Sequence, residues 1–188
     1  MIVFVRHGET PPNRDGLLLG RVDPALTDAG RQQADHLASR LHALAPDLVV
    51  SSPLERARET AAPIAKAAGC AVDVDERLIE IDYGEWDGQP FADLTPDVVW
   101  RWRGDADFAP PGGESLRVVG GRIAGFCDEW LSPERVVVAV SHVSPIKAAV
   151  CWALGVGDEL AWRMRLDVAS ITRIAVGPVL LSFNEPGT

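Results

Sequence analysis

The sequence predicts an α/β fold, a three-layer sandwich with a mostly parallel central sheet and helices on both faces. Short apolar runs alternate along the chain with longer stretches of helical periodicity, the pattern of such sheets. The apolar runs are nearly continuous, as in strands buried on both faces. Three of the runs end abruptly in polar residues, which in these folds marks the edge where ligands bind.

Six strands are expected from the apolar runs. In chain order they cover residues 2–5, 48–50, 71–74, 136–140, 171–176 and 179–183. The fourth is the strongest prediction because four of its five residues are valine. Gly177-Pro178 separates the last two strands and predicts a turn between them.

Helices are expected between these strands. They cover a stretch from Thr27-Asp28 to Pro46, then about 54–68, 97–103, 115–130 and 145–154. In the first of them, apolar residues recur three and four positions apart and give one apolar face. Pro46 is expected to stop that helix, and Gly69 suits the C-terminal cap of the second.

The stretch from about 76 to 114 shows neither the periodicity of a helix nor that of a strand. It predicts a loop-rich insertion that covers a site. It is rich in glycine and proline and contains Trp86, Trp100 and Trp102. We expect Trp86 to pack beneath the loop, while the other two could line a lid or form an aromatic core. With no repeat or linker visible, residues 1–188 are predicted to form a single domain.

The formal net charge of −9 argues against nucleic-acid binding and against attraction to an anionic membrane. An anionic substrate would therefore need a local basic pocket, for which the sixteen arginines are suited. Cys70, Cys127 and Cys151 form neither a disulfide framework nor a zinc motif, and we expect reduced thiols. No secretory signal and no membrane-spanning stretch is visible, so a cytoplasmic location is expected.

Polar residues follow three of the predicted strands. They are Arg6-His7, Ser51-Ser52 with Arg56 nearby, and Ser141-His142. Because ligands bind outside the carboxyl ends of parallel strands, these side chains are expected to meet in one crevice. The sequence therefore predicts two histidines and two arginines at one site.

The sequence around these residues resembles the histidine phosphatase superfamily, also called the phosphoglycerate mutase-like family. The first motif is Arg-His-Gly-Glu-Thr at 6–10, with Asn13 six residues past the histidine. Further motifs follow in family order at 20–30, 51–61, 78–88, 111–115 and 140–142. The resemblance spans residues 1 to about 150 and implies the phosphoglycerate mutase-like fold.

The resemblance implies that His7 is phosphorylated during catalysis and that Arg6, Arg56 and His142 bind the phosphate. A neutral imidazole is a suitable nucleophile toward an anion, and cationic donors stabilise the charge on the transferring group. Asn13 is expected to hydrogen-bond a phosphate oxygen or the substrate. Arg58 is expected to be a solvated helix residue.

The family's acid/base position falls on Glu80, which would protonate the leaving group and later activate water. Its acidic neighbours Glu76, Asp82 and Glu85 are competing candidates. The residues Val143-Ser144-Pro145 replace the small or glycine residues of many relatives, so backbone donation there is not assigned. Lys147 follows on the same helix and is placed outside the site.

We expect a phosphatase that acts on a small phosphorylated metabolite without metal ion or cofactor. The stretch from Tyr83 to Pro111 holds only Arg101 and Arg103 as basic residues, which disfavours a mutase. A mutase and a non-catalytic phosphate-binding module remain the alternatives. Broad-specificity and α-ribazole phosphatases are both compatible with the sequence, and the oligomeric state is open.

Overall fold

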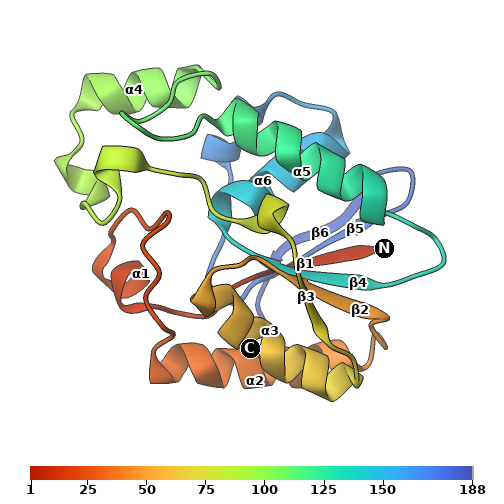
Figure 1. Ribbon diagram of the computed structural model, residues 1–188. Coiled ribbons are helices and arrows are strands. Elements are labelled where there is room, and N and C mark those ends of the chain that lie inside the picture. The colour runs from red at the N-terminus through yellow and green to blue at the C-terminus, as the bar shows by residue number, and fades with distance from the viewer. Residues whose placement is uncertain (188) are drawn as a thin grey trace.

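The computed structural model describes residues 1–187 and is built around one six-stranded sheet (Figure 1). The strand order is β3-β2-β4-β1-β5-β6. The first four of these run parallel, whereas β5 and β6 are antiparallel additions at one edge. The strands are β1 (Ile2–Arg6), β2 (Leu48–Ser51), β3 (Val72–Val74), β4 (Val137–Ser141), β5 (Ile171–Ala175) and β6 (Val179–Glu185).

Helices cover both faces of the sheet. The helices α2 (Asp28–His42) and α3 (Glu55–Ala68) lie on one face, and α5 (Leu116–Trp130) and α6 (Val143–Leu154) lie on the other (Figure 1). Successive side chains of a strand point to opposite faces. Ile2 and Phe4 of β1 accordingly join the core under α5 and α6, and Val3 and Val5 join the core under α2 and α3.

The expected α/β sandwich is confirmed, and the differences are local. Helix α2 ends at His42, before Pro46. The residue before a proline is disfavoured in the helical conformation, and Ala45, which precedes Pro46, takes a left-handed φ of 46° instead. Helix α6 begins two residues before Pro145, which stands in the first turn, where a missing N–H breaks no hydrogen bond. Gly120 lies inside α5, where its lack of a side chain admits the Asp158 carboxylate.

A short helix that the sequence did not predict, α1 (Pro11–Asp15), follows the first strand and its loop. Thr10 stands at its N-cap, and the Asn13 side chain reaches back to accept a hydrogen bond from the Thr10 N–H. Pro11 and Pro12 occupy the first turn, where their fixed φ favours a helix. The two prolines therefore stiffen this segment by starting a helix.

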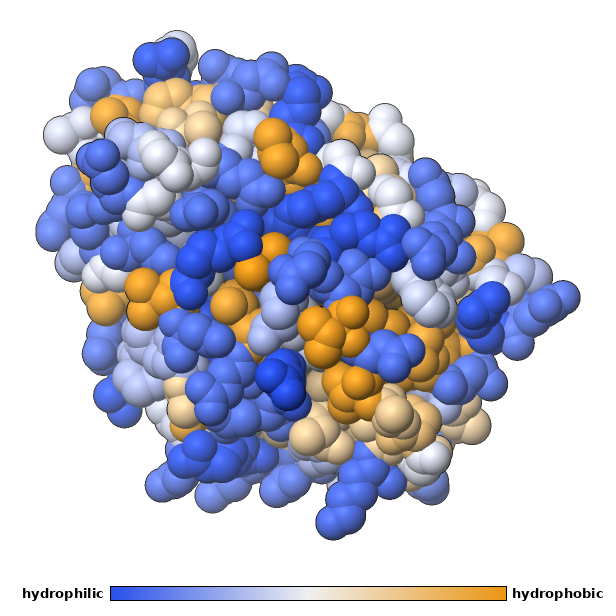
Figure 2. Space-filling view, viewed as in Figure 1, coloured by the Kyte–Doolittle hydropathy of each residue, from blue (hydrophilic) through white to orange (hydrophobic). Residues whose placement is uncertain are grey.

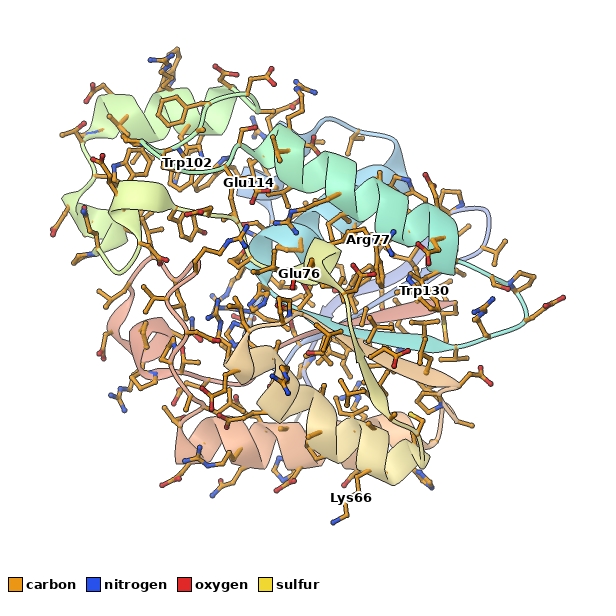
Figure 3. The ribbon with its side chains drawn as sticks, in the orientation of Figure 1. Lys66, Glu76, Arg77, Trp102, Glu114 and Trp130 are labelled. Carbon is orange, nitrogen blue, oxygen red and sulfur yellow. The ribbon has the colours of Figure 1, made fainter. Side chains whose placement is uncertain are left out.

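The segment 76–114, here called the cap segment, holds only short helices. They are η1 (Glu76–Leu78), η2 (Gly84–Trp86), η3 (Phe91–Asp93) and α4 (Pro96–Gly104), and η4 (Asp158–Arg163) packs against α4 from outside the segment. The side chain of Trp102 points from α4 toward the body of the protein and is 2% exposed (Figure 3). It contacts Tyr83, Trp86 and Trp162 edge to face, with ring centroids 5.8, 5.3 and 4.7 Å away. Trp102 is thus the centre of an aromatic core, whereas Trp100 is 80% exposed.

The surface in Figure 2 is mainly hydrophilic where the cap segment meets the body of the protein. Between residues 1 and 187, every helix is too short or too polar to cross a bilayer. The three cysteines are unpaired, and Cys127 and Cys151 are buried.

Candidate active site

The polar ends of three neighbouring strands meet at one edge of the sheet. Arg6 pairs with Ser141 in the register of β1 and β4, and Ser51 pairs with Val140 in the register of β2 and β4. The chain continues this alignment past the strands, since the His7 N–H donates to the Ser141 carbonyl at 3.1 Å. This edge faces α1 and the cap segment (Figure 1). The predicted convergence of the polar strand ends is therefore a direct result of strand register.

His7 is buried and held in one tautomer. Its Nδ1 lies 2.7 Å from the Gly8 carbonyl, which can only accept, so Nδ1 carries the proton. The lone pair is therefore on Nε2. Burial, followed by the charges of Arg56 and Arg6, holds the pKa of His7 well below its usual value. At neutral pH the imidazole is neutral and nucleophilic.

Backbone carbonyls orient the two arginines. Arg6 donates from Nη1 to the Leu166 carbonyl at 2.7 Å. Arg56 is fully buried and donates to the carbonyls of Gly20 and Val22 at 2.7 and 2.8 Å. Burial lowers the pKa of Arg6 to about 10, so it remains charged at neutral pH. Two fixed positive charges therefore lie beside the neutral His7.

His142 lies next to His7, with ring centroids 5.0 Å apart. Its Nε2 lies 2.7 Å from the Ser52 hydroxyl. Burial, followed by the charge of Arg56, holds the pKa of His142 well below its usual value, so this ring too is neutral at neutral pH. The Ser52 hydroxyl also accepts the Leu54 N–H at 3.4 Å, which leaves its own proton to donate to Nε2 and so favours a proton on Nδ1 of His142.

Three N–H groups of these residues are buried without a hydrogen-bond partner anywhere in residues 1–187. They are Nε of Arg6, Nε of Arg56 and Nδ1 of His142. Leaving buried donors unpaired is costly, and native proteins rarely do so without a functional reason. An anion with several oxygens would satisfy all three, so the arrangement has the chemistry of a phosphate site.

Glu80 is 3% exposed, and backbone N–H groups hold its carboxylate at the N-terminus of α6. Val143 and Ser144 donate to it at 3.0 and 3.1 Å, and Ile81 donates at 2.8 Å. The unusual residues after His142 thus keep their backbone donors, which orient Glu80. Because these donors directly follow His142 in the chain, Glu80 lies beside the phosphate-binding groups.

The other acidic residues of this stretch lie elsewhere. Glu76 and Glu85 are exposed, and the Asp82 carboxylate accepts the Gly84 N–H at 2.8 Å to cap a turn. Of the four candidates, Glu80 alone is buried at the crevice.

Asn13 is half-buried in α1 beyond the end of β1. Its Oδ1 accepts from the Thr10 N–H at 3.2 Å and from the Thr10 hydroxyl at 2.9 Å. The amide is therefore fixed through its oxygen, and Nδ2 is the group left to donate to a ligand.

Gly8 has a structural function in the loop after β1. A side chain there would meet the Gly30 carbonyl oxygen at 2.5 Å, so the loop packs on the first turn of α2 only because Gly8 has none. The Gly8 N–H donates to the Thr60 hydroxyl at 3.0 Å. Thr60 in turn donates to the Arg56 carbonyl at 2.8 Å within α3, so it links the loop of Gly8 to the helix that carries Arg56.

Several supporting residues were given no role from the sequence, although each lies in one of the family motifs; Ser52 was expected only to lie in the crevice. Ser52 and Thr60 contact His142 and the loop of Gly8, as described above. Asp87 binds the loop that holds Arg56. Glu114 lies at the start of α5 and pairs with Arg21 at 3.4 Å and Arg122 at 3.1 Å (Figure 3). Position in a motif was the available signal, but it did not reveal the partner of any of them.

No group of three or more His, Cys, Asp or Glu side chains among residues 1–187 is arranged to hold a metal ion. Lys147, which the sequence placed outside the site, lines a cavity formed in part by the residues that bind Glu80.

Comparison with known proteins identifies a family. The sequence model of the histidine phosphatase superfamily (branch 1) matches residues 2–183. Phosphoserine phosphatase 1 of Hydrogenobacter thermophilus is 36% identical over 182 residues, which cover 92% of this chain and 85% of that protein. The structure of a mycobacterial glucosyl-3-phosphoglycerate phosphatase with VO3 is 33% identical, has a TM-score of 0.89, and matches over 97% of this chain and 98% of the other.

A bifunctional protein of Mycobacterium tuberculosis is 37% identical over 180 residues, which cover 91% of this chain. The match covers 49% of that protein, so the chain spans about half its length.

Proposed function

The chain belongs to the histidine phosphatase superfamily, and from that premise we propose that it hydrolyses small phosphate monoesters through a phosphohistidine at His7. The family and fold expected from the motifs are confirmed. The observation that carries the proposal is the set of three unpartnered nitrogens, on Arg6, Arg56 and His142, together with a neutral imidazole at His7. These groups match the charge and the oxygens of a phosphoryl group.

In the first step, the Nε2 lone pair of His7 attacks phosphorus while the bond to the ester oxygen breaks. The unpartnered donors bind the phosphoryl oxygens, whose charge they stabilise in the transition state. Glu80 in its protonated form supplies a proton to the departing oxygen, which leaves as the alcohol. The product of this step is the phosphorylated enzyme with a Glu80 carboxylate.

In the second step, Glu80 accepts a proton from a water molecule as that water attacks phosphorus. The bond from phosphorus to Nε2 breaks, and inorganic phosphate and neutral His7 are released. Because Glu80 is again protonated, the cycle closes. The Gly8 carbonyl keeps the proton on Nδ1 throughout, so Nε2 remains the reactive atom.

Two further roles belong to the proposal. Asn13 donates from Nδ2 to a phosphate oxygen or to the substrate, because its other amide atom is fixed by Thr10. The cap segment, within a single domain of residues 1–188, covers the site.

A cytoplasmic location stays a prediction from the sequence.

Hydrolysis is favoured over mutase chemistry by the positions of the cap arginines. Arg101 stacks over the Phe108 ring at 5.0 Å, and Arg103 stacks over the Trp162 ring at 5.5 Å. These arginines are exposed and are engaged on aromatic rings of the cap. The relatives described above are named as phosphatases of phosphoserine and of glucosyl-3-phosphoglycerate, which supports hydrolysis of a small phosphorylated metabolite.

The test is to trap the intermediate. Brief incubation with a ³²P-labelled monoester, followed by alkaline denaturation, is expected to leave acid-labile label on the peptide that contains His7. His7→Ala should abolish both the label and turnover of p-nitrophenyl phosphate, whereas the exposed His36→Ala should change neither. Label on another residue, or turnover by His7→Ala near the wild-type rate, would contradict the mechanism. Phosphate binding without any turnover would indicate the non-catalytic module.

A further inference from the structure

A small cavity adjoins the phosphate site on the side of α6. Its walls include Ile81, Val143 and Ser144, the same three residues whose backbone N–H groups bind Glu80. Trp102 and Trp162 of the aromatic core close it further out. The cavity therefore lies between the residues that hold the proposed acid/base residue and the aromatic core.

The size of the cavity limits what it can hold. About 60 Å³ is open to the centres of water-sized molecules. About 10–15 Å³ by this measure suffices for one water molecule. The cavity thus has room for a leaving group of a few heavy atoms and excludes a bulky one.

Lys147 supplies a positive charge to this mainly apolar cavity, in which Tyr83 and Ser144 are the other polar residues. It lies one helical turn after Val143, is half-buried, and lines the cavity on the same face of α6. Its ammonium forms no hydrogen bond or ion pair within residues 1–187. Burial lowers the pKa of Lys147. The nearby charge of Glu80 raises this pKa, and the charge of Arg6 lowers it. The Glu80 carboxylate is already held by three N–H donors, so Lys147 is left to bind another anion.

We propose that Lys147 binds a carboxylate on the leaving group, so that the preferred substrates are small phosphate monoesters whose alcohol carries a carboxylate. This inference rests on the proposed function, because it places the leaving group in the cavity beside Glu80. Two arginines would then hold the phosphoryl group and one lysine the other end of the substrate. Such a second anchor would increase kcat/KM by fixing the ester oxygen near Glu80.

Matched substrate pairs test the proposal. O-phosphoserine is compared with O-phosphoethanolamine, and 3-phosphoglycerate with glycerol 3-phosphate, each pair differing in the carboxylate. The wild type should prefer the carboxylate-bearing member. Lys147→Met should lower kcat/KM for that member by about 10- to 100-fold, the usual effect of losing a hydrogen bond to a charged group. The partner substrates and p-nitrophenyl phosphate should change by less than about 3-fold, within ordinary context effects.

The controls follow from the lysine content of the chain, which has only Lys66 and Lys147. Lys66 projects away from the body of the protein at the end of α3 (Figure 3), so Lys66→Met should leave all four rates unchanged. Lys147→Arg keeps the charge and should restore part of the preference. Equal losses on both members of each pair, or no loss, would overturn the proposal.

A binding measurement that does not depend on turnover completes the test. In the His7→Ala variant with ¹³C-dimethylated lysines, 3-phosphoglycerate should shift the Lys147 resonance and glycerol 3-phosphate should not, with Lys66 as the internal reference. A shift with both ligands, or with neither, would refute the role of Lys147. If the wild type hydrolyses all the esters without preference, this inference fails alone; if it hydrolyses none, the proposed function fails as well.

Discussion

Asp87 and Arg56 both bind the loop of residues 20–22, Asp87 through the N–H groups of the loop and Arg56 through its carbonyl groups. The Asp87 carboxylate accepts the N–H groups of Gly20, Arg21 and Val22 at 2.7, 2.7 and 2.8 Å. Arg56 donates to the carbonyls of Gly20 and Val22. An acidic residue of the cap segment thus fixes the loop that orients Arg56, an arginine of the proposed phosphate site.

Asp87→Asn is expected to lower kcat by about 10- to 100-fold, because misplacing a phosphate-binding group by about 1 Å has effects of that size. An amide offers one oxygen to three N–H groups, so the loop and Arg56 should lose their fixed position. Since Arg56 acts on the transition state, vanadate affinity should fall together with kcat, while KM changes less.

The exposed Asp93→Asn serves as the matched control and should retain wild-type kinetics. If Asp87→Asn lowered the melting temperature but kept kcat and vanadate affinity, Asp87 would have only a structural role.

Glu80→Gln is expected to slow hydrolysis of alkyl phosphates by about 10²–10⁴-fold, the usual range for lost acid/base catalysis. Aryl phosphates such as p-nitrophenyl phosphate should suffer less in the burst step, because their leaving groups need little protonation. The comparison is made by steady-state and rapid-quench kinetics on both classes. Glu76→Gln is the control; a strong effect there, or equal losses on both classes in Glu80→Gln, would reassign the acid/base residue.

The buried histidines should make stability depend on pH below neutrality. The unfolded chain takes up protons at His7 and His142 as pH falls through about 6.5, whereas the folded protein, with both pKa values well below 6.5, does not. The unfolded state then binds more protons, so the free energy of unfolding decreases as pH falls below about 6.5. Each histidine contributes about 1.4 kcal/mol per pH unit in that window.

Urea denaturation of wild type and His7→Gln at pH 7.5, 6.5 and 5.5 measures this effect. Below pH 6.5 the free energy of unfolding of the variant should fall less steeply with pH than that of the wild type, by the contribution of one histidine. Parallel curves for wild type and His7→Gln would show that His7 titrates normally in the folded protein.

Catalysis is expected to need no metal ion, because Arg6, Arg56 and His142 provide the positive charge and donors that a divalent metal supplies elsewhere. Activity should survive EDTA, and elemental analysis of the purified protein should find no stoichiometric metal. Vanadate should inhibit, since its oxygens match the unpartnered donors. Activity lost to the chelator and restored by one divalent ion would mean that the donors serve another purpose.

The sequence by itself determined the sheet and its two helical layers, and it predicted which residues would meet at the candidate site. Strand patterns are local, and parallel strands necessarily bring their carboxyl ends to one edge, so Arg6, His7 and His142 were predictable from the positions where the apolar runs end. The helix of Pro11–Asp15 was missed because its cap depends on one side-chain hydrogen bond, from Asn13 back to Thr10.

The tertiary structure alone decided which groups face one another across the site. Three features join segments far apart in the chain. They are the hydrogen bonds from the start of α6 to Glu80, the hydrogen bonds from the loop of residues 20–22 to Asp87, and the cavity beside Lys147. Hydrogen bonds and burial depend on distances between such segments, and no local pattern of residues encodes those distances. Strand register and helix packing set them, and with them the protonation and orientation of each group in the site.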